Sequence, residues 1–378
     1  MENENQLNLT AIQEKMKFLG FNNSSLAEQL GVTREIVSKW VTGKKNPRPR
    51  HMLELAKTLS LKFEEIIIPD LPEPIIAFRK RGRSKTTKDH VERAKQMGES
   101  LKSLLPYLPF DISKKPAVLL NPKNEFNYIK RIVKKLREDL NLSDIDVFQY
   151  EKIIELFKNY HAVLIPVLWG VKDYHENAIH IYLPDSMTTW IYLNLEVEKH
   201  DFKFWMAHEL GHVLATDLIG DEGEDFADSF AAELLFPSEV AEHSYKKITQ
   251  NKTESSKISY IKNIAKKYEI SPYTVYSQVN LYAKTNGLQN LELKAIHGAA
   301  KNFNKSFPKI SEIIFNNQTP DVSAYIYKSE KLLQTSFFKS LKKFILSEEV
   351  NFTYLKDILK ISIPVAKEIY DELKNGSE

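Results

Sequence analysis

The chain has 378 residues, a formal net charge of +3, and an ordinary composition of 42% hydrophobic and 27% charged residues. This length and composition suit two or three globular domains, and they exclude a fibrous or wholly disordered protein. Because the chain has no cysteine, disulfides and thiolate metal ligands are also excluded, so any metal must be held by His, Asp or Glu.

The most apolar run, residues 162–171, is too short to cross a bilayer. The N-terminus "MENENQLNLT" has neither the basic region nor the apolar core of a secretory signal. We therefore expect a cytoplasmic protein with no membrane partner.

Residues 7–68 place apolar side chains at helical spacing, interrupted by short polar turns. Ser25 is expected to cap one helix and Thr33 the next, with Gly31 in the turn between them. The second helix has a polar start and is followed by a strongly basic turn. This is the arrangement with which a helix-turn-helix reads the major groove of DNA.

This segment resembles the lambda-repressor-like (XRE-type) DNA-binding domain over about residues 8–68. The resemblance implies a double-stranded DNA operator as partner and leaves a homodimer open. The alternative is a small helical bundle used for dimerisation or protein contact. The implied base and phosphate contacts are Asn23, Thr33, Arg34, Glu35 and Lys39, and the implied phosphate contacts are Lys44, Lys45 and Arg48.

The next segment, residues 69–123, begins with the proline-rich stretch "PDLPEPIIAF" and continues as a strongly basic one. Such a composition is typical of a linker followed by a solvated connecting helix. Beyond it, residues 128–140 have the spacing of an amphipathic helix. Three short β-branched or aromatic runs then predict a small sheet, and helical spacing returns at residues 202–215.

The helix predicted over residues 202–215 carries a motif with metal chemistry. His208 and His212 lie one helical turn apart and therefore share a face, with Glu209 beside the first. In an H-E-x-x-H motif the two histidines bind zinc and the glutamate acts as a base toward a water molecule.

A catalytic zinc usually has three protein ligands and one open position, so a further acid is needed. Glu224 and Asp228 lie one turn apart on a second predicted helix that ends before Pro237. One of them can bind the metal while the other accepts the N–H of a ligand histidine. Spacing alone leaves other acids open as the third ligand, namely Asp217, Asp221 and Asp225.

The sequence His208-Glu209-Leu210-Gly211-His212, followed by Glu224-x-x-Ala-Asp-x-Phe-Ala-Ala-Glu-Leu-Leu-x-Pro237, resembles the ImmA/IrrE family of zinc metallopeptidases. The resemblance extends over about residues 124–286. It implies Zn²⁺ held by His208, His212 and Glu224, with Glu209 as the catalytic base and Asp228 behind a ligand histidine. The candidate oxyanion donors are Tyr273, Tyr276 and His243.

We therefore expect an α+β, mostly helical chain. Its parts are a helix-turn-helix bundle (8–68), a linker with a basic helix (69–123), a zincin-like peptidase domain with a small sheet (124–287) and a helical sensor or interaction domain (288–378). An extended substrate is expected to add a strand to the sheet near residues 190–194.

The expected function is a DNA-binding transcriptional regulator whose zinc endopeptidase cleaves a regulatory protein, either a repressor, an antitoxin or itself. The alternative is a non-proteolytic transcription factor or antitoxin that uses the zincin-like domain as a sensing or structural core.

Overall fold

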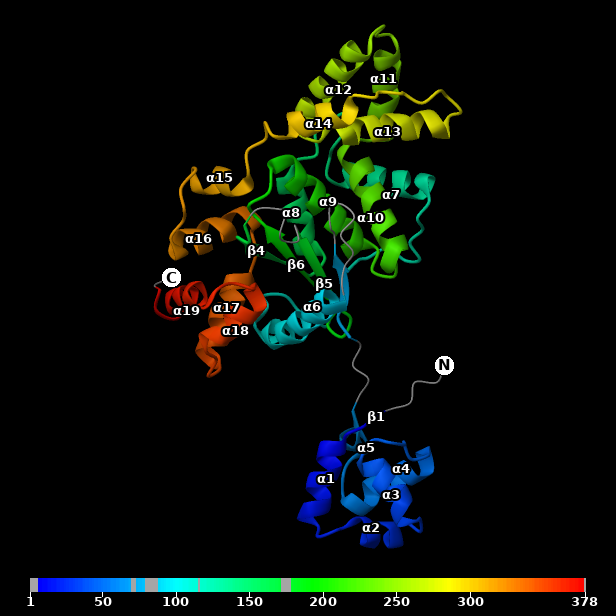
Figure 1. Ribbon diagram of the computed structural model, residues 1–378, viewed down its shortest axis with the longest axis vertical. Coiled ribbons are helices and arrows are strands. Elements are labelled where there is room, and N and C mark those ends of the chain that lie inside the picture. Colours follow the sequence, from blue (N-terminus) through cyan, green and yellow to red (C-terminus); the bar gives the residue numbers. More distant parts are fainter. Residues whose placement is uncertain (1–5, 69–72, 79–87, 115, 171–177, 377–378) are drawn as a thin grey trace. The chain divides into compact units, whose positions relative to one another are not determined.

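The computed structural model describes residues 6–68, 73–78, 88–114, 116–170 and 178–376. The chain divides into two compact units, Met1–Glu73 and Pro74–Glu378 (Figure 1). Helices dominate, and the second unit contains a four-stranded sheet, which confirms the expected α+β, mostly helical class. Among the residues described, no helix is both long and apolar enough to span a membrane.

The first unit is a bundle of short helices around a core that includes Leu26, Val37 and Trp40. Strand β1 (Gln6–Leu7) pairs antiparallel with β2 (Ile67–Ile68), which ties the two ends of the bundle together. The helices are α1 (Leu9–Phe18), α2 (Asn23–Gln29), α3 (Arg34–Val41), α4 (Pro49–Leu59) and α5 (Phe63–Ile66).

The start of α2 differs from the sequence expectation. Asn22 is the N-cap, and its side chain accepts hydrogen bonds from the backbone of Ser24 and Ser25. Ser25 instead occupies the third helical position and accepts a bond from the Asn22 backbone, which completes a capping box. The expectation of a cap at Ser25 was wrong because Asn22 satisfies the free N–H groups one turn earlier.

The sheet of the second unit has the strand order β3-β5-β6-β4. Its strands are β3 (Ile75–Phe78), β4 (Ala162–Val167), β5 (Ala178–Leu183) and β6 (Thr188–Asn194). The β4–β6 pair is parallel and the other two pairs are antiparallel. Because β6 is paired on both sides, the expected addition of a substrate strand at residues 190–194 was wrong.

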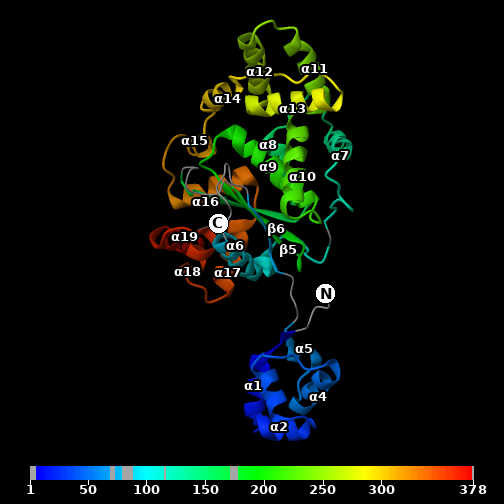
Figure 2. The same cartoon turned by 45° about the vertical axis from the view of Figure 1, so that its right-hand side comes forward.

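Helices cover both faces of this sheet (Figures 1 and 2). One face is covered by α8 (Tyr150–Asn159) and α9 (Lys199–Leu214). The other is covered by α6 (Lys88–Leu101) and by helices from the C-terminal part of the chain. There the Tyr325 hydroxyl donates to the Pro166 carbonyl at 2.6 Å, and Trp169 Nε1 donates to the Leu359 carbonyl at 2.9 Å.

These contacts bring several parts of the second unit into one core. Residues 288–378 share one hydrophobic core with the sheet, because their helices bury a face that would otherwise be exposed to water. Residues predicted as a linker also belong to this core, since they supply strand β3, helix α6 and the 3-10 helix η1 (Lys102–Tyr107). The described parts of residues 74–123 and 288–376 therefore belong with the sheet to one compact unit, and the finer domain bounds stay a prediction.

The buried side chain of Arg137 links two further helices by hydrogen bonds. Arg137, on α7 (Phe126–Asp139), donates to the Leu234 carbonyl at the end of α10 (Gly220–Leu235) at 2.7 Å and to the Ser143 carbonyl at 2.8 Å.

The other helices of the second unit follow in chain order. They are α11 (Ser238–Thr249), α12 (Glu254–Tyr268), α13 (Pro272–Thr285), α14 (Ile296–Asn304), α15 (Ile310–Phe315), α16 (Val322–Leu333), α17 (Phe337–Ser347), α18 (Phe352–Leu359) and α19 (Ile363–Asn375).

Lys203 on α9 gives the fold a pH dependence that can be tested. Its ammonium is buried and donates to the Tyr268 carbonyl at 2.7 Å, and burial lowers its pKa to about 8. In the unfolded chain the pKa returns to its ordinary value of 10.5, so the unfolded state binds more protons between these two values. Stability contributed by Lys203 therefore rises as pH increases through this window.

We predict that wild type gains about 1–2 kcal/mol in free energy of unfolding relative to Lys203→Met between pH 8 and pH 10. Urea unfolding of both proteins at several pH values measures the difference. Lys266→Met serves as the control because Lys266 is exposed on α12. A difference between wild type and Lys203→Met that stays constant over this range would contradict the prediction.

Candidate metal centre

The site is built where α10 crosses α9 at very short range. A Cβ atom on Gly211 would lie 2.9 Å from the Cα of Ala227, so only glycine allows the two helix backbones to pack this closely. Glu224 lies on α10, one turn before Ala227. The close crossing therefore brings its carboxylate to the histidines of α9.

Three side chains converge at this crossing. The Nε2 atoms of His208 and His212 lie 3.1 Å apart, and the Glu224 carboxylate oxygens lie 3.5 Å and 3.3 Å from them, respectively. In a tetrahedral zinc centre, ligand atoms at about 2.0–2.2 Å from the metal are roughly 3.3–3.5 Å from one another. Within the described residues, these three form the group of His and acidic side chains that could hold one ion.

The donor chemistry also fits a cation. His208 Nδ1 lies 2.8 Å from a carboxylate oxygen of Asp228, which assigns the proton of a neutral His208 to Nδ1. The Nε2 atom of His208 then presents a lone pair toward His212 Nε2 and the Glu224 carboxylate. Converging lone pairs repel one another unless a proton or a metal ion lies between them, so the residues present fit a divalent metal.

The two histidines keep Glu224 ionised in spite of its partial burial. Burial by itself raises the pKa of Glu224, but hydrogen bonds from His208 and His212, together with their charge, outweigh this effect and hold the pKa well below its ordinary range. The histidine side chains are almost fully buried, whereas that of Glu224 is 33% exposed and that of Asp228 is 47% exposed. The cluster is therefore reached from solvent along α10.

Glu209 lies beside the cluster and has a buried partner that the sequence analysis missed. His180, on β5, places Nδ1 3.0 Å from Oε2 of Glu209, and both side chains are nearly fully buried. Burial lowers the pKa of His180. Burial also acts to raise the pKa of Glu209, but the hydrogen bond with His180 and the charge of the three histidines hold it below its ordinary value.

A sequence signal for His180 did exist. It is a histidine within a largely apolar strand, and such a residue needs a buried partner.

The structure separates the candidates for the third ligand. Asp217, Asp221 and Asp225, which spacing alone had left open, are all exposed and lie outside the ion-holding group. Glu233, on the same helix, accepts from the backbone N–H (3.0 Å) and hydroxyl (2.8 Å) of Ser238 and so caps α11.

Two of the suggested oxyanion donors have other contacts, and the third is exposed. The Tyr276 hydroxyl donates to the Leu291 carbonyl at 2.8 Å, the Tyr273 ring packs 4.9 Å from that of His297, and His243 is exposed on α11. Their oxyanion role stays a prediction.

In the first unit, Thr33 caps α3, and the candidate DNA contacts of the recognition helix and the following turn are exposed. Asn23 and Arg34 line a hollow of about 720 Å³ together with residues of α1. The exposed candidates are Thr33, Arg34, Glu35, Lys39, Lys44, Lys45 and Arg48.

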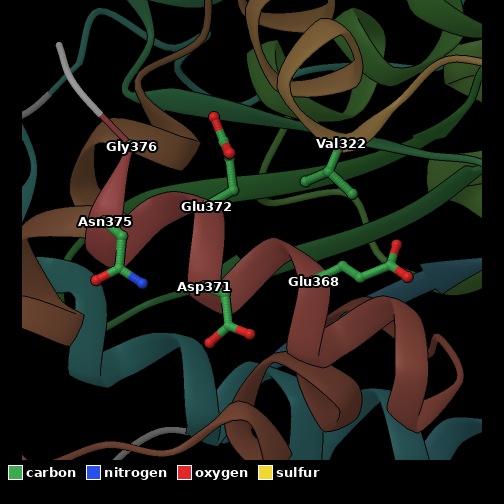
Figure 3. A pocket seen from close by; sticks show the side chains of 6 residues that line it. All are labelled: Val322, Glu368, Asp371, Glu372, Asn375 and Gly376. Atoms are coloured by element: carbon green, nitrogen blue, oxygen red, sulfur yellow. The ribbon is translucent and has the colours of Figure 1, made fainter.

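A separate hollow of about 450 Å³ lies on the acidic face of α19. Figure 3 shows the carboxylates of Glu368, Asp371 and Glu372 around it, with Val322 opposite. None of the residues expected to act in metal binding or catalysis lines it.

Comparison with known proteins finds two families that match separate parts of the chain. Residues 12–66 match the family described as helix-turn-helix, and residues 163–279 match the M78 peptidase family described as IrrE N-terminal-like domain. The chain joins a helix-turn-helix domain to an IrrE-like domain. Both expected resemblances are thereby confirmed, and the chain is a regulator-type protein with a DNA-binding domain and a peptidase-family domain.

No curated protein matches the chain. A solved structure of Bacillus thuringiensis PlcR in complex with the peptide PapR7 and DNA aligns over 85% of this chain and 97% of that chain at 14% identity. The TM-score of this alignment is 0.16.

The contact between His208 and Asp228 can be tested without a substrate. We predict that Asp228→Ala weakens zinc binding about 10–100-fold, because the carboxylate that orients the His208 ring is lost. Competition with a chromophoric chelator measures the affinity. Asp225→Ala is the matched control, since Asp225 is an exposed acid on the same helix. Equal zinc affinities of wild type and Asp228→Ala would show that this contact does not support the site.

Proposed function

We propose that the IrrE-like domain of this DNA-binding regulator is a zinc endopeptidase that cleaves a regulatory protein, either a repressor, an antitoxin or the chain itself. The observation that carries the proposal is the convergence of His208, His212 and Glu224 at tetrahedral ligand spacing, with the buried carboxylate of Glu209 alongside. A purely structural core does not require a carboxylate in that position.

The roles of the side chains follow from their positions. His208, His212 and Glu224 would hold a zinc ion, and the chemistry it would supply is that of a Lewis acid toward a peptide carbonyl and water. Glu209, with its depressed pKa, is ionised at neutral pH and accepts the proton of the attacking water, then passes it to the leaving amine. His180 holds one oxygen of Glu209, which leaves the other for this transfer. Asp228 fixes the orientation of the His208 ring.

One observation favours a second candidate, a zincin-like domain that senses a ligand without cleaving protein. Oε2 of Glu209 is already bound to His180 in a buried pair, and such a pair can be purely structural. In that case the metal cluster stabilises the fold and the base has no catalytic role.

Glu209→Gln separates the two candidates. We predict that this variant keeps its zinc and its fold but loses cleavage about 10²–10⁴-fold, because the amide cannot accept the proton. New protein N-termini, identified by mass spectrometry in cells that express either protein, measure cleavage. Glu222→Gln, an exposed acid on α10, is the control and should behave as wild type. Identical sets of N-termini with wild type and Glu209→Gln would support the sensing candidate.

The proposed DNA contacts have their own test. Lys44 and Lys45 follow the recognition helix and are exposed, so we propose that they neutralise phosphates. Replacing both by alanine should reduce the steepness with which log affinity for duplex DNA falls with log salt concentration, by about 2 units of slope. Fluorescence anisotropy at several salt concentrations measures this slope. Lys57→Ala/Lys62→Ala, which removes two exposed lysines not proposed as contacts, should leave the slope unchanged. A slope unaffected by loss of Lys44 and Lys45 would exclude them as phosphate contacts.

A further inference from the structure

Strand β3 occupies the edge of the sheet that lies next to the metal site. Ile75–Phe78 pairs antiparallel with β5, and without it β5 would be the edge of the sheet. In this register Ala77 lies opposite His180. Residues directly opposite in an antiparallel pair project from the same face, so position 77 lies on the face that contacts α9.

A short series of contacts links this position to the catalytic groups. His180 contacts Glu209 at 3.0 Å, and the centre of its ring lies 5.3 Å from that of His212. Position 77 of β3 is thus separated from the proposed base by a single side chain. An extended peptide that brought a carbonyl to Glu209 by pairing with β5 would need the edge that β3 already holds.

β3 is a short strand with limited burial. It has four residues, Ile75 is 38% exposed, and Ile76 and Ala77 are half-buried, whereas most of β5 is buried. Short and poorly buried elements separate locally at a lower free-energy cost than central strands. Its position depends on α6, where a Cβ on Gly98 would lie only 2.7 Å from the side chain of Pro74.

We propose that β3 is a built-in occupant of the peptide-binding edge, which blocks the site until it separates from β5. The inference rests on the proposed peptidase function. The natural occupant after release is an extended peptide that pairs antiparallel with β5 and places a small residue opposite His180. β3 is the first strand of the second unit, which begins at Pro74, directly after the unit that ends at Glu73.

Peptide binding tests this without any need for cleavage. The probe is a fluorescein-labelled peptide with the sequence of residues 73–78, added to the zinc-loaded full chain that carries Glu209→Gln. Ile76→Pro/Ala77→Pro removes two adjacent backbone N–H groups, of which one points toward β5 in an antiparallel ladder. Ile76→Val/Ala77→Ser, which keeps both N–H groups, is the control.

If β3 is paired with β5 about 90–99% of the time, the double-proline protein should bind the peptide about 10–100-fold more tightly than the Glu209→Gln chain without strand substitutions. The Ile76→Val/Ala77→Ser control should bind like that chain. Equal affinities of all three proteins would overturn the proposal.

Hydrogen exchange on the unaltered chain gives a second test that does not depend on the folding of a variant. Amides of β3 should exchange at least about 10-fold faster than those of β6, because β3 opens locally. Exchange as slow as in β6 would show that β3 is a permanent strand and would overturn the proposal.

Three results would separate this inference from the proposed function. Cleavage of a protein substrate by wild type while β3 amides remain protected would overturn the blocking role but leave the peptidase intact. Cleavage of the chain within residues 74–78 on zinc loading would make β3 a substrate and would also overturn its blocking role. Tight peptide binding by the double-proline protein, without cleavage by any protein that retains Glu209, would support the edge site and reject proteolysis.

Discussion

The close crossing of α9 and α10 at Gly211 is the contact on which the candidate site depends. Two histidines on one helical turn can share a metal, but the third ligand must come from another element, and its position must be accurate to a few tenths of an ångström. The missing Cβ at Gly211 lets the backbone of α10 approach, and the buried rings of Phe226 and Phe230 hold that helix in place. At the far end of α10, Arg137 binds the Leu234 carbonyl. The metal cluster is thus positioned by packing along the middle of α10 and by a hydrogen bond at its C-terminal end.

The sheet beneath α9 extends this dependence to distant parts of the chain. One face carries the site helix, and the other is buried by α6 and by helices after residue 288. Tyr325 and Thr335 donate hydrogen bonds to carbonyls of β4, so the C-terminal segment also satisfies polar groups on the strands. The strand that carries His180 is covered at its edge by β3. Segments before and after the peptidase-family region therefore complete the layer that positions Glu209.

Local patterns were sufficient to predict part of this arrangement. The H-E-x-x-H motif lies within two turns of one helix, so helical geometry alone placed His208 and His212 on one face, as the structure shows. The third ligand was not accessible in this way, because several acids satisfied the spacing, and family resemblance was needed to favour Glu224. Strand β3 was missed because a short apolar segment among prolines is typical of a linker, and its partner strand lies far along the chain. Residues 288–378 were expected to be helical, but their sequence does not show that these helices cover the sheet. His180 was missed for the same reason, since its partner Glu209 belongs to a different element.

The metal content of the purified protein tests the central claim most directly. Elemental mass spectrometry should find about one zinc per chain in wild type and in the exposed-acid control Glu222→Ala, and little in Glu224→Ala, because a catalytic zinc needs its third protein ligand. Circular dichroism would confirm that the Glu224→Ala chain is still folded. An absence of zinc from wild type even after zinc is supplied, or equal zinc in wild type and Glu224→Ala, would contradict the assignment of His208, His212 and Glu224 as a metal centre.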